Sequence, residues 1–482
     1  MKRRQFLQSG SLMSLPMLLG GMEVATMSNS SLFSMLAVDD DKVLVLIQLN
    51  GGNDGLNMVI PLDQYSGLSL VRPNLMIPEA SVLKLTDKTG IHSSMTGLHR
   101  LFKEEKLAVV QSVGYPNQNR SHFRSTDIWT SASDATTYLR NGWAGRYLDQ
   151  QYPGYPDAYP STKYPDPFAI TIGNIVSETC QGPMTNMSFT LANQASVRLV
   201  EETVARPVDG SCYGTEVEYI RTSIKQANSY ASTVLKSFDK GTNKVTYPDG
   251  NRLGAQLKIV ANLISGGLKS KIYVVNLGGF DTHANQVLIG DTKNGTHADL
   301  LSTVSGAIDA FVQDCASLGI HERVMGMTFS EFGRQIRANN SLGTDHGTAA
   351  PLIVFGSCAR QGVYGDNPQI TSTVAPQEGV PMQFDFRSVY ASLLIDWLGA
   401  SESDIRNVLY KDFQKIPFVK NCALPSSTDE QLAIVDAKIS PNPCYDHTVL
   451  SFVNEGKHVH ISTLNALGFL IDTPVNKSLN KG

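Results

Sequence analysis

The sequence lacks long apolar runs, is low in charge and has few cysteines, and each shortage excludes a class of protein. After the N-terminal segment no stretch has eighteen apolar residues in a row, so no integral membrane span is expected. Forty Lys and Arg against 44 Asp and Glu give a net charge of -4, which excludes nucleic-acid binding by bulk charge. Six cysteines in 482 residues are too few for a disulfide scaffold. What is present, 41% hydrophobic residues, is enough for a large core.

The N-terminus has the composition of an export signal. A basic start, Lys2-Arg3-Arg4, precedes Gln5-Phe6-Leu7 and a short apolar stretch over residues 10–20. This order resembles a twin-arginine signal, which implies the twin-arginine machinery as a partner and folding before export. Residues 1–37 are therefore predicted to be signal and linker, cleaved after Ala25 or Ala37, and the protein to reach the periplasm, cell surface or medium. The alternative is a basic start on an amphipathic helix.

Strand and helix patterns alternate between about residues 42 and 415. Strands are expected at residues 42–49, 107–113, 271–277, 323–329 and 352–355, and helices at 98–106, 252–268, 298–318 and 388–398. This alternation predicts an α/β fold with a mostly parallel sheet between helices. Residues 38–420 are expected to form this domain. Residues 150–250, rich in Tyr, Pro, Ser and Thr, are expected to be an insertion over the sheet edge.

The character of the sequence changes after Lys420. Residues 421–436 are predicted to be a linker and residues 437–482 a small β-rich, sandwich-like tail. The Ser-Pro-Asn-Pro opening at residues 440–443, three short strand patterns and Asn-Ala-Leu-Gly at residues 465–468 resemble the C-terminal sorting domain of type IX secretion in Bacteroidetes-like bacteria. The resemblance implies a partial sorting domain that lacks its last strand, and the type IX machinery as a second partner. The alternative is a small β-sandwich with no sorting role.

Export would permit disulfides, but the sequence alone does not fix their pairing. Cys180 could pair with Cys212 across a loop-rich segment, and Cys422 with Cys444 across the linker. Cys315 lies in a helical pattern and Cys358 follows an apolar strand, so both are expected to be buried thiols.

Polar residues collect where the predicted strands end, which is where ligands bind in open α/β sheets. Four such places occur: Asn53-Asp54, Asp281-Thr282-His283, Ser330-Glu331 and Asp345-His346. Carboxylate and imidazole groups at neighbouring strand ends can hold a metal ion together. Each place alone could be structural, as a lone Asp in a Gly-rich turn usually is. Their recurrence within one alternating pattern favours a metal site.

A fifth stretch, residues 119–127, supplies hydroxyls, a histidine and two arginines after the second strand. Arginine suits a bidentate grip on a tetrahedral oxyanion such as phosphate or sulfate. The alternative is a helix N-terminus capped by serine.

Several long motifs together resemble the DUF1501 family of exported bacterial proteins. They are GGNDGLN, NRSHFRSTDIW, GWAGRYL, GGFDTHANQ, FSEFGRQIRANNSLGTDHGTAAPLIVFG and DFRSVYASLLIDWLG, which span nearly all of residues 42–400. That family is grouped by resemblance with the alkaline phosphatase and sulfatase superfamily, and the activity of most members is unassigned. The resemblance implies an alkaline-phosphatase-like three-layer sandwich, with function to be argued from the site.

The superfamily pattern implies metal ligands at the strand ends. Carried over by position, the ligands are Asp54, Asp281, His283, Glu331 and His346. Asp345 is implied to orient the imidazole of His346, or, in an alternative register, to be a ligand beside it. Phe332 departs from the pattern because it stands where the superfamily has a histidine.

The catalytic groups are expected in the fifth stretch, at Ser121, His122 and Arg124. Ser121 is the first choice of nucleophile, followed by Ser125 and Thr126, and Arg120 or Arg124 would hold the anion. No cysteine occurs there, which argues against a sulfatase of the cysteine-derived formylglycine type.

Two functions remain open at this stage. The first is an exported hydrolase of phosphate or sulfate esters, such as those of extracellular polysaccharide or lipid, that uses a divalent ion: zinc, manganese, calcium or magnesium. The second is a non-catalytic surface binding or assembly protein on a degenerate hydrolase fold, which Phe332 favours.

Overall fold

The structure is a computed structural model that describes residues 41–198, 211–371, 373–420 and 422, together with four strands of the C-terminal segment. Residues 40–422 form one compact unit, and the two ends of the chain form another. The predicted export signal, the linker and Cys444 lie outside the described residues.

A nine-stranded sheet forms the centre of the larger unit. Its strands are β1 (Val43–Asn50), β5 (Leu107–Gly114), β6 (Ala169–Ile172), β7 (Ser188–Leu191), β8 (Ile272–Gly278), β9 (Val324–Phe329), β10 (Ala350–Phe355), β11 (Gly362–Tyr364) and β12 (Phe384–Asp385). The order is β11-β5-β10-β9-β1-β8-β6-β7, with β12 also paired to β5. Every pairing is parallel except the two made by β10, with β9 and with β5.

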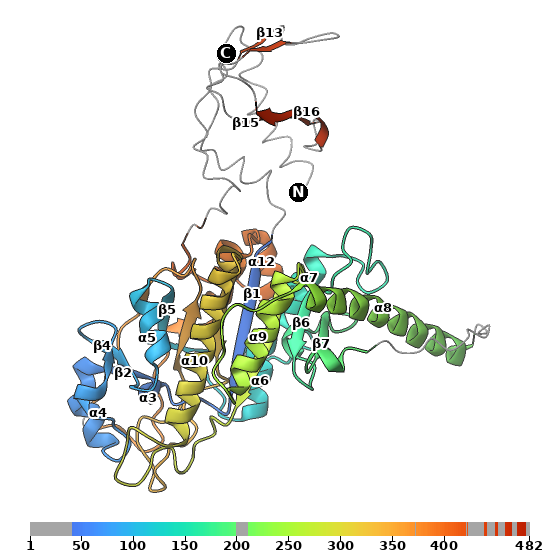
Figure 1. Ribbon diagram of the computed structural model, residues 1–482. Coiled ribbons are helices and arrows are strands. Elements are labelled where there is room, and N and C mark those ends of the chain that lie inside the picture. Colours follow the sequence, from blue (N-terminus) through green and yellow to red (C-terminus); the bar gives the residue numbers. More distant parts are fainter. Residues whose placement is uncertain are drawn as a thin grey trace. The chain divides into compact units, whose positions relative to one another are not determined.

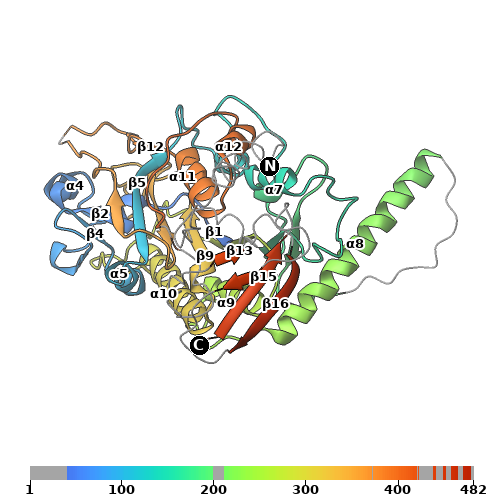
Figure 2. The same ribbon diagram turned by 90° about the horizontal axis from the view of Figure 1, so that it is seen from above.

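Helices cover both faces of this sheet. They are α3 (Gly55–Met58), α4 (Tyr65–Val71), α5 (Thr96–Lys103), α6 (His122–Ser131), α7 (Trp143–Gln151), α8 (Cys212–Lys240), α9 (Arg252–Ser265), α10 (Thr296–Ser317), α11 (Phe386–Ser392) and α12 (Glu402–Leu409). A π-helical turn, Leu393–Trp397, extends α11. Figure 2 shows α5, α9 and α10 on one side of the sheet, with α7, α11 and α12 on the other.

The two faces of β1 show why the layers form. Val45 and Ile47 pack with α5, α9 and α10, whereas Leu44 and Leu46 pack with α6, α7 and α11. All four side chains are fully buried, as expected for a parallel strand between two helix layers. The three-layer α/β fold predicted from the sequence is therefore confirmed.

The predicted strands and helices of the sheet domain are found with shifts of one to three residues at most ends. Within residues 150–250, where the weak periodicity predicted no strands or helices, the structure has two strands and a long helix. The four-residue strands β6 and β7 extend the sheet itself, and α8 runs for 29 residues. Figure 1 shows α8 projecting from the side of the sheet that carries β6 and β7.

A smaller sheet stands apart from the central one, with β2 (Val59–Pro61), β3 (Leu83–Lys84) and β4 (Thr89–Ile91) in the order β2-β4-β3. The C-terminal segment has two antiparallel pairs. They are β13 (Lys438–Ser440) with β14 (Val449–Ser451), and β15 (His458–Leu464) with β16 (Leu470–Ser478). No helix among the described residues is long and apolar enough to cross a membrane.

The cysteine pairing differs from both alternatives drawn from the sequence. Cys358 and Cys422 form a disulfide across 64 residues, and Cys180 is a free, buried thiol. Cys358 was expected to be a thiol because an apolar strand precedes it. Residues 418–420 return to this strand's end, however, where the backbone of Lys420 donates to the Cys358 carbonyl. The free, buried state of Cys315 is as expected.

Candidate metal centre

The loops at one edge of the sheet bring the predicted site residues together. Asp281 and His283 follow β8, and Glu331 follows β9, at the carboxyl ends of parallel strands. His346 precedes β10, and because β10 runs opposite to its neighbours its start lies at the same edge. His122 opens α6, which follows β5. The antiparallel strand thus explains how a residue before a strand joins residues that follow other strands.

Close backbone approach fixes these loops against one another. Gly51 has φ +120°, and a Cβ there would lie 2.3 Å from the Asp281 nitrogen. Arg334 and His346 form an isolated antiparallel bridge, which joins the two ends of the loop between β9 and β10. A Cβ at Gly347 would lie 2.1 Å from the Arg334 carbonyl carbon. Glycine is therefore required where the loops touch.

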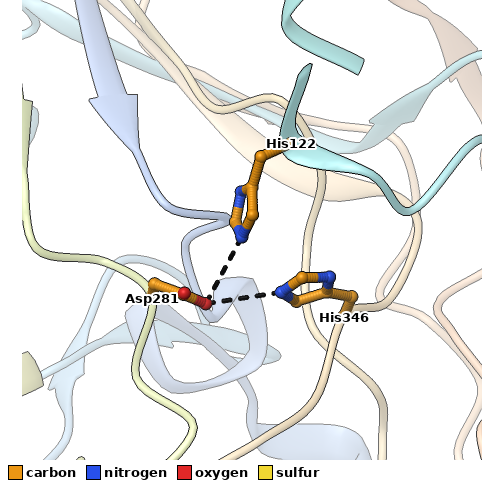
Figure 3. A group of neighbouring side chains, drawn as sticks. All are labelled: His122, Asp281 and His346. Carbon is orange, nitrogen blue, oxygen red and sulfur yellow. Dashed lines mark hydrogen bonds and ion pairs between the residues drawn. The ribbon is translucent and has the colours of Figure 1, made fainter. Parts of the chain in front are cut away.

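Three side chains face one another at this edge. The imidazole nitrogens of His122 and His346 and a carboxylate oxygen of Asp281 all lie within 4.8 Å of one another. Figure 3 shows both rings pointing at the Asp281 carboxylate from different loops. The distances from Oδ1 of Asp281 are 3.5 Å to Nε2 of His122 and 3.4 Å to Nε2 of His346.

His283 lies beside this group and offers a fourth donor atom. Its Nε2 is 3.1 Å from Oδ1 of Asp281 and 2.9 Å from Nε2 of His346. The sequence therefore placed Asp281, His283 and His346 in one site, and the structure brings these three together. It also adds His122, which the sequence suggested for catalysis rather than for metal binding.

The far nitrogen of each imidazole is held by an acceptor. Nδ1 of His122 lies 2.7 Å from Glu331, and Nδ1 of His283 lies 2.8 Å from Asp345. Nδ1 of His346 lies 2.8 Å from the carbonyl oxygen of Arg120. This arrangement, in which Nδ1–H is held by an acceptor and Nε2 is turned toward the other donor atoms, is the usual support of metal-binding histidines. Asp345 was expected to orient His346 but is bonded to His283, because the carbonyl of Arg120 already occupies Nδ1 of His346. Glu331 likewise orients His122, and neither carboxylate belongs to the group of three.

The donor set fits a zinc-like ion. Donor atoms bound at about 2.0–2.1 Å in a tetrahedron lie about 3.3 Å apart, close to the 2.9–3.5 Å of four pairs here, while the donor nitrogens of His122 and His346 lie within 4.8 Å of each other. Nε2 of His122 is buried and makes no hydrogen bond to the described residues, so it is a polar atom in need of a partner. Imidazole-rich sets suit zinc better than manganese, calcium or magnesium, which prefer oxygen ligands.

A buried arginine anchors the carboxylate of the centre. Arg334 is fully buried and donates to the backbone carbonyls of Gly52, Thr344 and Phe280 and, at 2.6 Å, to Asp281. Burial raises the pKa of Asp281, but the bond and charge of Arg334 outweigh this and leave the pKa below its usual value. Burial also lowers the pKa of His346, which favours a neutral imidazole. Arg334 lies in the SEFGR stretch, but nothing in that stretch predicts that its guanidinium holds the carboxylate of Asp281.

Asp54 lies in a separate cluster. Both its oxygens accept from Arg72, at 3.0 and 2.8 Å, and one also accepts from Gln286 at 2.7 Å. Burial raises the pKa of Asp54, but Arg72, His297 and Gln286 together lower it below the usual value. His297 is fully buried beneath this cluster, and burial lowers its pKa to about 4. Asp54 is thus not among the residues gathered at the metal centre, and its predicted ligand role remains a prediction.

The proposed catalytic residues other than His122 separate in space. Arg124 is buried and donates to the carbonyls of Asp134, Ala135 and Thr137, so its guanidinium is held within the loop that follows α6. Ser125 is fully buried, and its hydroxyl is bonded to Tyr115 and Asn119. Ser121 is exposed at the N-cap of α6, and its side chain makes no cap hydrogen bond.

A cavity of about 870 Å³ opens beside the centre. His122, Asp281 and Glu331 form one part of its wall, and Thr126, one turn after His122 on α6, forms another. Of the three hydroxyls considered from the sequence, Thr126 is the one in this wall. Phe332 is buried behind the site, with its ring centroid 4.9 Å from that of His122 and 4.7 Å from that of His346.

Comparison with known families supports part of the resemblance drawn from the motifs. The model of a family described as "Protein of unknown function (DUF1501)" matches residues 263–396. That segment carries Asp281, His283, Glu331, Asp345 and His346, whereas His122 lies outside it. No curated protein matches the chain.

Solved structures with a related outline are distant in sequence. The C-terminal periplasmic domain of EcEptC from Escherichia coli, in complex with Zn, is 11% identical, with 80% of this chain and 92% of that chain covered and a TM-score of 0.35. A protein of the alkaline phosphatase superfamily from Vibrio parahaemolyticus is 10% identical (77% and 70% covered, TM-score 0.35). The PsFucS1 sulfatase from Pseudoalteromonas sp. is 12% identical (92% and 82% covered, TM-score 0.34). Because these scores are below 0.5, the function proposed next rests on the chain's own residues.

Proposed function

We propose that the protein is an exported, metal-dependent hydrolase of phosphate or sulfate esters. The observation that carries the proposal is the group of His122, Asp281 and His346, with the far nitrogen of each imidazole held by an acceptor, beside a large cavity whose wall includes His122 and Asp281. Three protein donors with an open side are typical of catalytic zinc sites. The phosphate or sulfate class comes from the motif resemblance, and export from the N-terminal sequence.

His122, Asp281 and His346 would hold the ion, and zinc fits their donor atoms best. A bound ion would polarise the ester and stabilise the charge that develops on its oxygens. The residues around it have positioning roles. Glu331 and the carbonyl of Arg120 orient the two imidazoles, and Arg334 fixes the carboxylate of Asp281.

We assign the attack on the ester to the hydroxyl of Thr126. It replaces Ser121 as first choice because it lines the cavity four residues after His122 on the same helix, where side chains share a face. In the first step the Thr126 oxygen bonds to phosphorus or sulfur as the ester's alcohol leaves with a proton. Water then releases the phosphate or sulfate from the threonine.

The test is a screen of 4-nitrophenyl phosphate and 4-nitrophenyl sulfate with metal-loaded protein and two matched variants. Thr126→Val is expected to lose at least a hundredfold in kcat while its metal content stays unchanged, and Thr126→Ser to retain part of the activity. A Thr126→Val variant as active as the parent would remove this residue from the mechanism. No turnover of either ester by fully metal-loaded parent would contradict the hydrolase itself.

The second candidate is a non-catalytic surface protein in which the ion is structural. His283 favours it, because a fourth protein donor would close the coordination shell. His283→Ala separates the two functions. In a closed site the variant loses its metal and there is no activity to lose, whereas in an open site the parent hydrolyses esters and the variant keeps part of its metal.

A further inference from the structure

Along β1 and β8, which form the cavity floor, the side chains that face the cavity change from apolar to polar. On the face of β1 that packs against α6 and α7, Leu44 and Leu46 are buried, but the next two side chains on that face are Gln48 and Asn50. Both amides line the cavity and are only partly buried. Asn276, paired in register with Gln48, is exposed although its neighbours on β8, Val275 and Leu277, are buried. The helices therefore leave this polar end of the sheet uncovered.

Hydroxyls complete the floor without adding charge. Thr126 and Thr130 of α6 and Thr171 of β6 line the same cavity as the three amides. The hydroxyls of Thr130 and Thr171 already donate, to the carbonyl of Thr126 and to Ser188, so they can serve a ligand only as acceptors. The amides and the Thr126 hydroxyl both donate and accept, so they suit a ligand with several uncharged hydroxyl or amide groups.

The opening of the cavity is apolar. Phe123 is 90% exposed and Ile175 is 82% exposed, although both belong to the cavity wall. Val176, beside Ile175, is 49% exposed. Phe123 lies on α6, whereas Ile175 and Val176 lie in the loop after β6, so the three side chains come from two sides of the opening. Large apolar groups left in water beside a polar cavity are typical of a binding site.

The charge of the cavity excludes one class of ligand. Its described lining residues include Asp127, Glu178, Asp281 and Glu331 but no lysine or arginine. Glu178 is exposed and makes no ion pair with the described residues. A polyanion would therefore meet carboxylates and no cation beyond the metal centre.

We propose that this cavity binds the alcohol part of the ester, and that this part is an uncharged amphiphile. Its hydroxyl or amide groups meet the floor of Gln48, Asn50 and Asn276, and its apolar part leaves between Phe123 and Ile175. This substrate class rests on the proposed hydrolase function, but the binding it requires can be measured without turnover.

The probe is octyl β-glucoside below its micelle concentration, titrated into full-length, chelator-treated protein by calorimetry. Saturable one-site binding is expected, with glucose at least tenfold weaker and dextran sulfate not bound. Phe123→Ser with Ile175→Ser is expected to weaken octyl glucoside binding at least tenfold. Ile289→Ser is the matched control because Ile289 is 91% exposed on a loop outside the cavity. That variant is expected to bind as the parent does.

Equal weakening by Ile289→Ser, absence of saturable binding, or preferential binding of dextran sulfate would overturn the proposal. Because no ester is cleaved in this experiment, its result is independent of the screen with nitrophenyl esters. Octyl glucoside binding by a protein that hydrolyses neither ester would refute the hydrolase alone. Ester hydrolysis without octyl glucoside binding would refute the substrate class alone.

Discussion

Replacement of Glu331 by glutamine tests whether the metal centre depends on its supporting carboxylate. Oε1 of Glu331 accepts from the backbone of Gly51 at 2.9 Å and lies 2.7 Å from Nδ1 of His122. The side chain is buried, with 3% of its surface exposed. Glutamine has the same shape, so the loops should stay in place while the charge that supports the imidazole is lost.

The expected loss of metal affinity follows from the contact between Glu331 and His122. Removal of such a supporting partner typically weakens metal affinity by about 10–100-fold, which is about 1.4–2.8 kcal/mol. With free zinc at 100 times the parent's Kd, binding stabilises the parent by about 2.7 kcal/mol. A variant with tenfold weaker affinity gains only about 1.4 kcal/mol under the same conditions. Without metal, the two proteins should differ little in stability.

The assay is competition for zinc with a fluorescent chelator, followed by denaturant unfolding with and without zinc. Glu178→Gln is the matched control because Glu178 lines the same cavity but has no hydrogen bond to an imidazole. It is expected to bind zinc as the parent does. A Glu331→Gln variant with the affinity of the parent, or a Glu178→Gln variant equally weakened, would refute this reasoning.

Three further predictions concern stability, measured by denaturant unfolding in the presence of chelator. Arg72→Met leaves the carboxylate of Asp54 buried without its partner, and should cost about 3–5 kcal/mol; a loss below 1 kcal/mol would mean that the pair is not needed. Phe332→Ala removes a fully buried ring and should also lower the free energy of unfolding by about 3–5 kcal/mol. A near-neutral result would indicate that the ring is exposed to solvent. Joint replacement of Cys358 and Cys422 by alanine opens a 64-residue loop and should cost about 2–4 kcal/mol, and a parent insensitive to reductant would contradict that disulfide.

The fold was predictable because its central strands are continuous apolar runs between helices of clear periodicity. β1 and β9 are buried along nearly their whole length. Their sequences are therefore mostly apolar, which is the pattern expected for a central strand. β6 and β7 were not predicted because each has four residues in a segment rich in turn-forming residues. Their place in the sheet is fixed by the pairing of β6 with β8, between residues about a hundred positions apart, and by the pairing of β7 with β6.

The site was only partly predictable because its members come from three separate segments: the start of α6, the loop after β8 and the connection between β9 and β10. Asp281, His283 and His346 could be found because each lies beside a strand end and belongs to a metal-binding residue type. His122 was assigned to catalysis, since nothing in its neighbourhood reveals that α6 turns its first imidazole toward Asp281. The ligand role of Asp54 remains a prediction, and its sequence does not show that Arg72 and Gln286 hold its oxygens in this structure.

The most direct measurement is the metal content of the mature protein, purified without chelator, by elemental analysis of the parent and of His346→Ala. His346 belongs to the site whether or not His283 completes the shell. The account predicts about one zinc-like ion per chain in the parent and its loss in a variant that remains folded by circular dichroism. Equal metal content in both proteins, or none in the parent after supplementation with zinc or manganese, would contradict it.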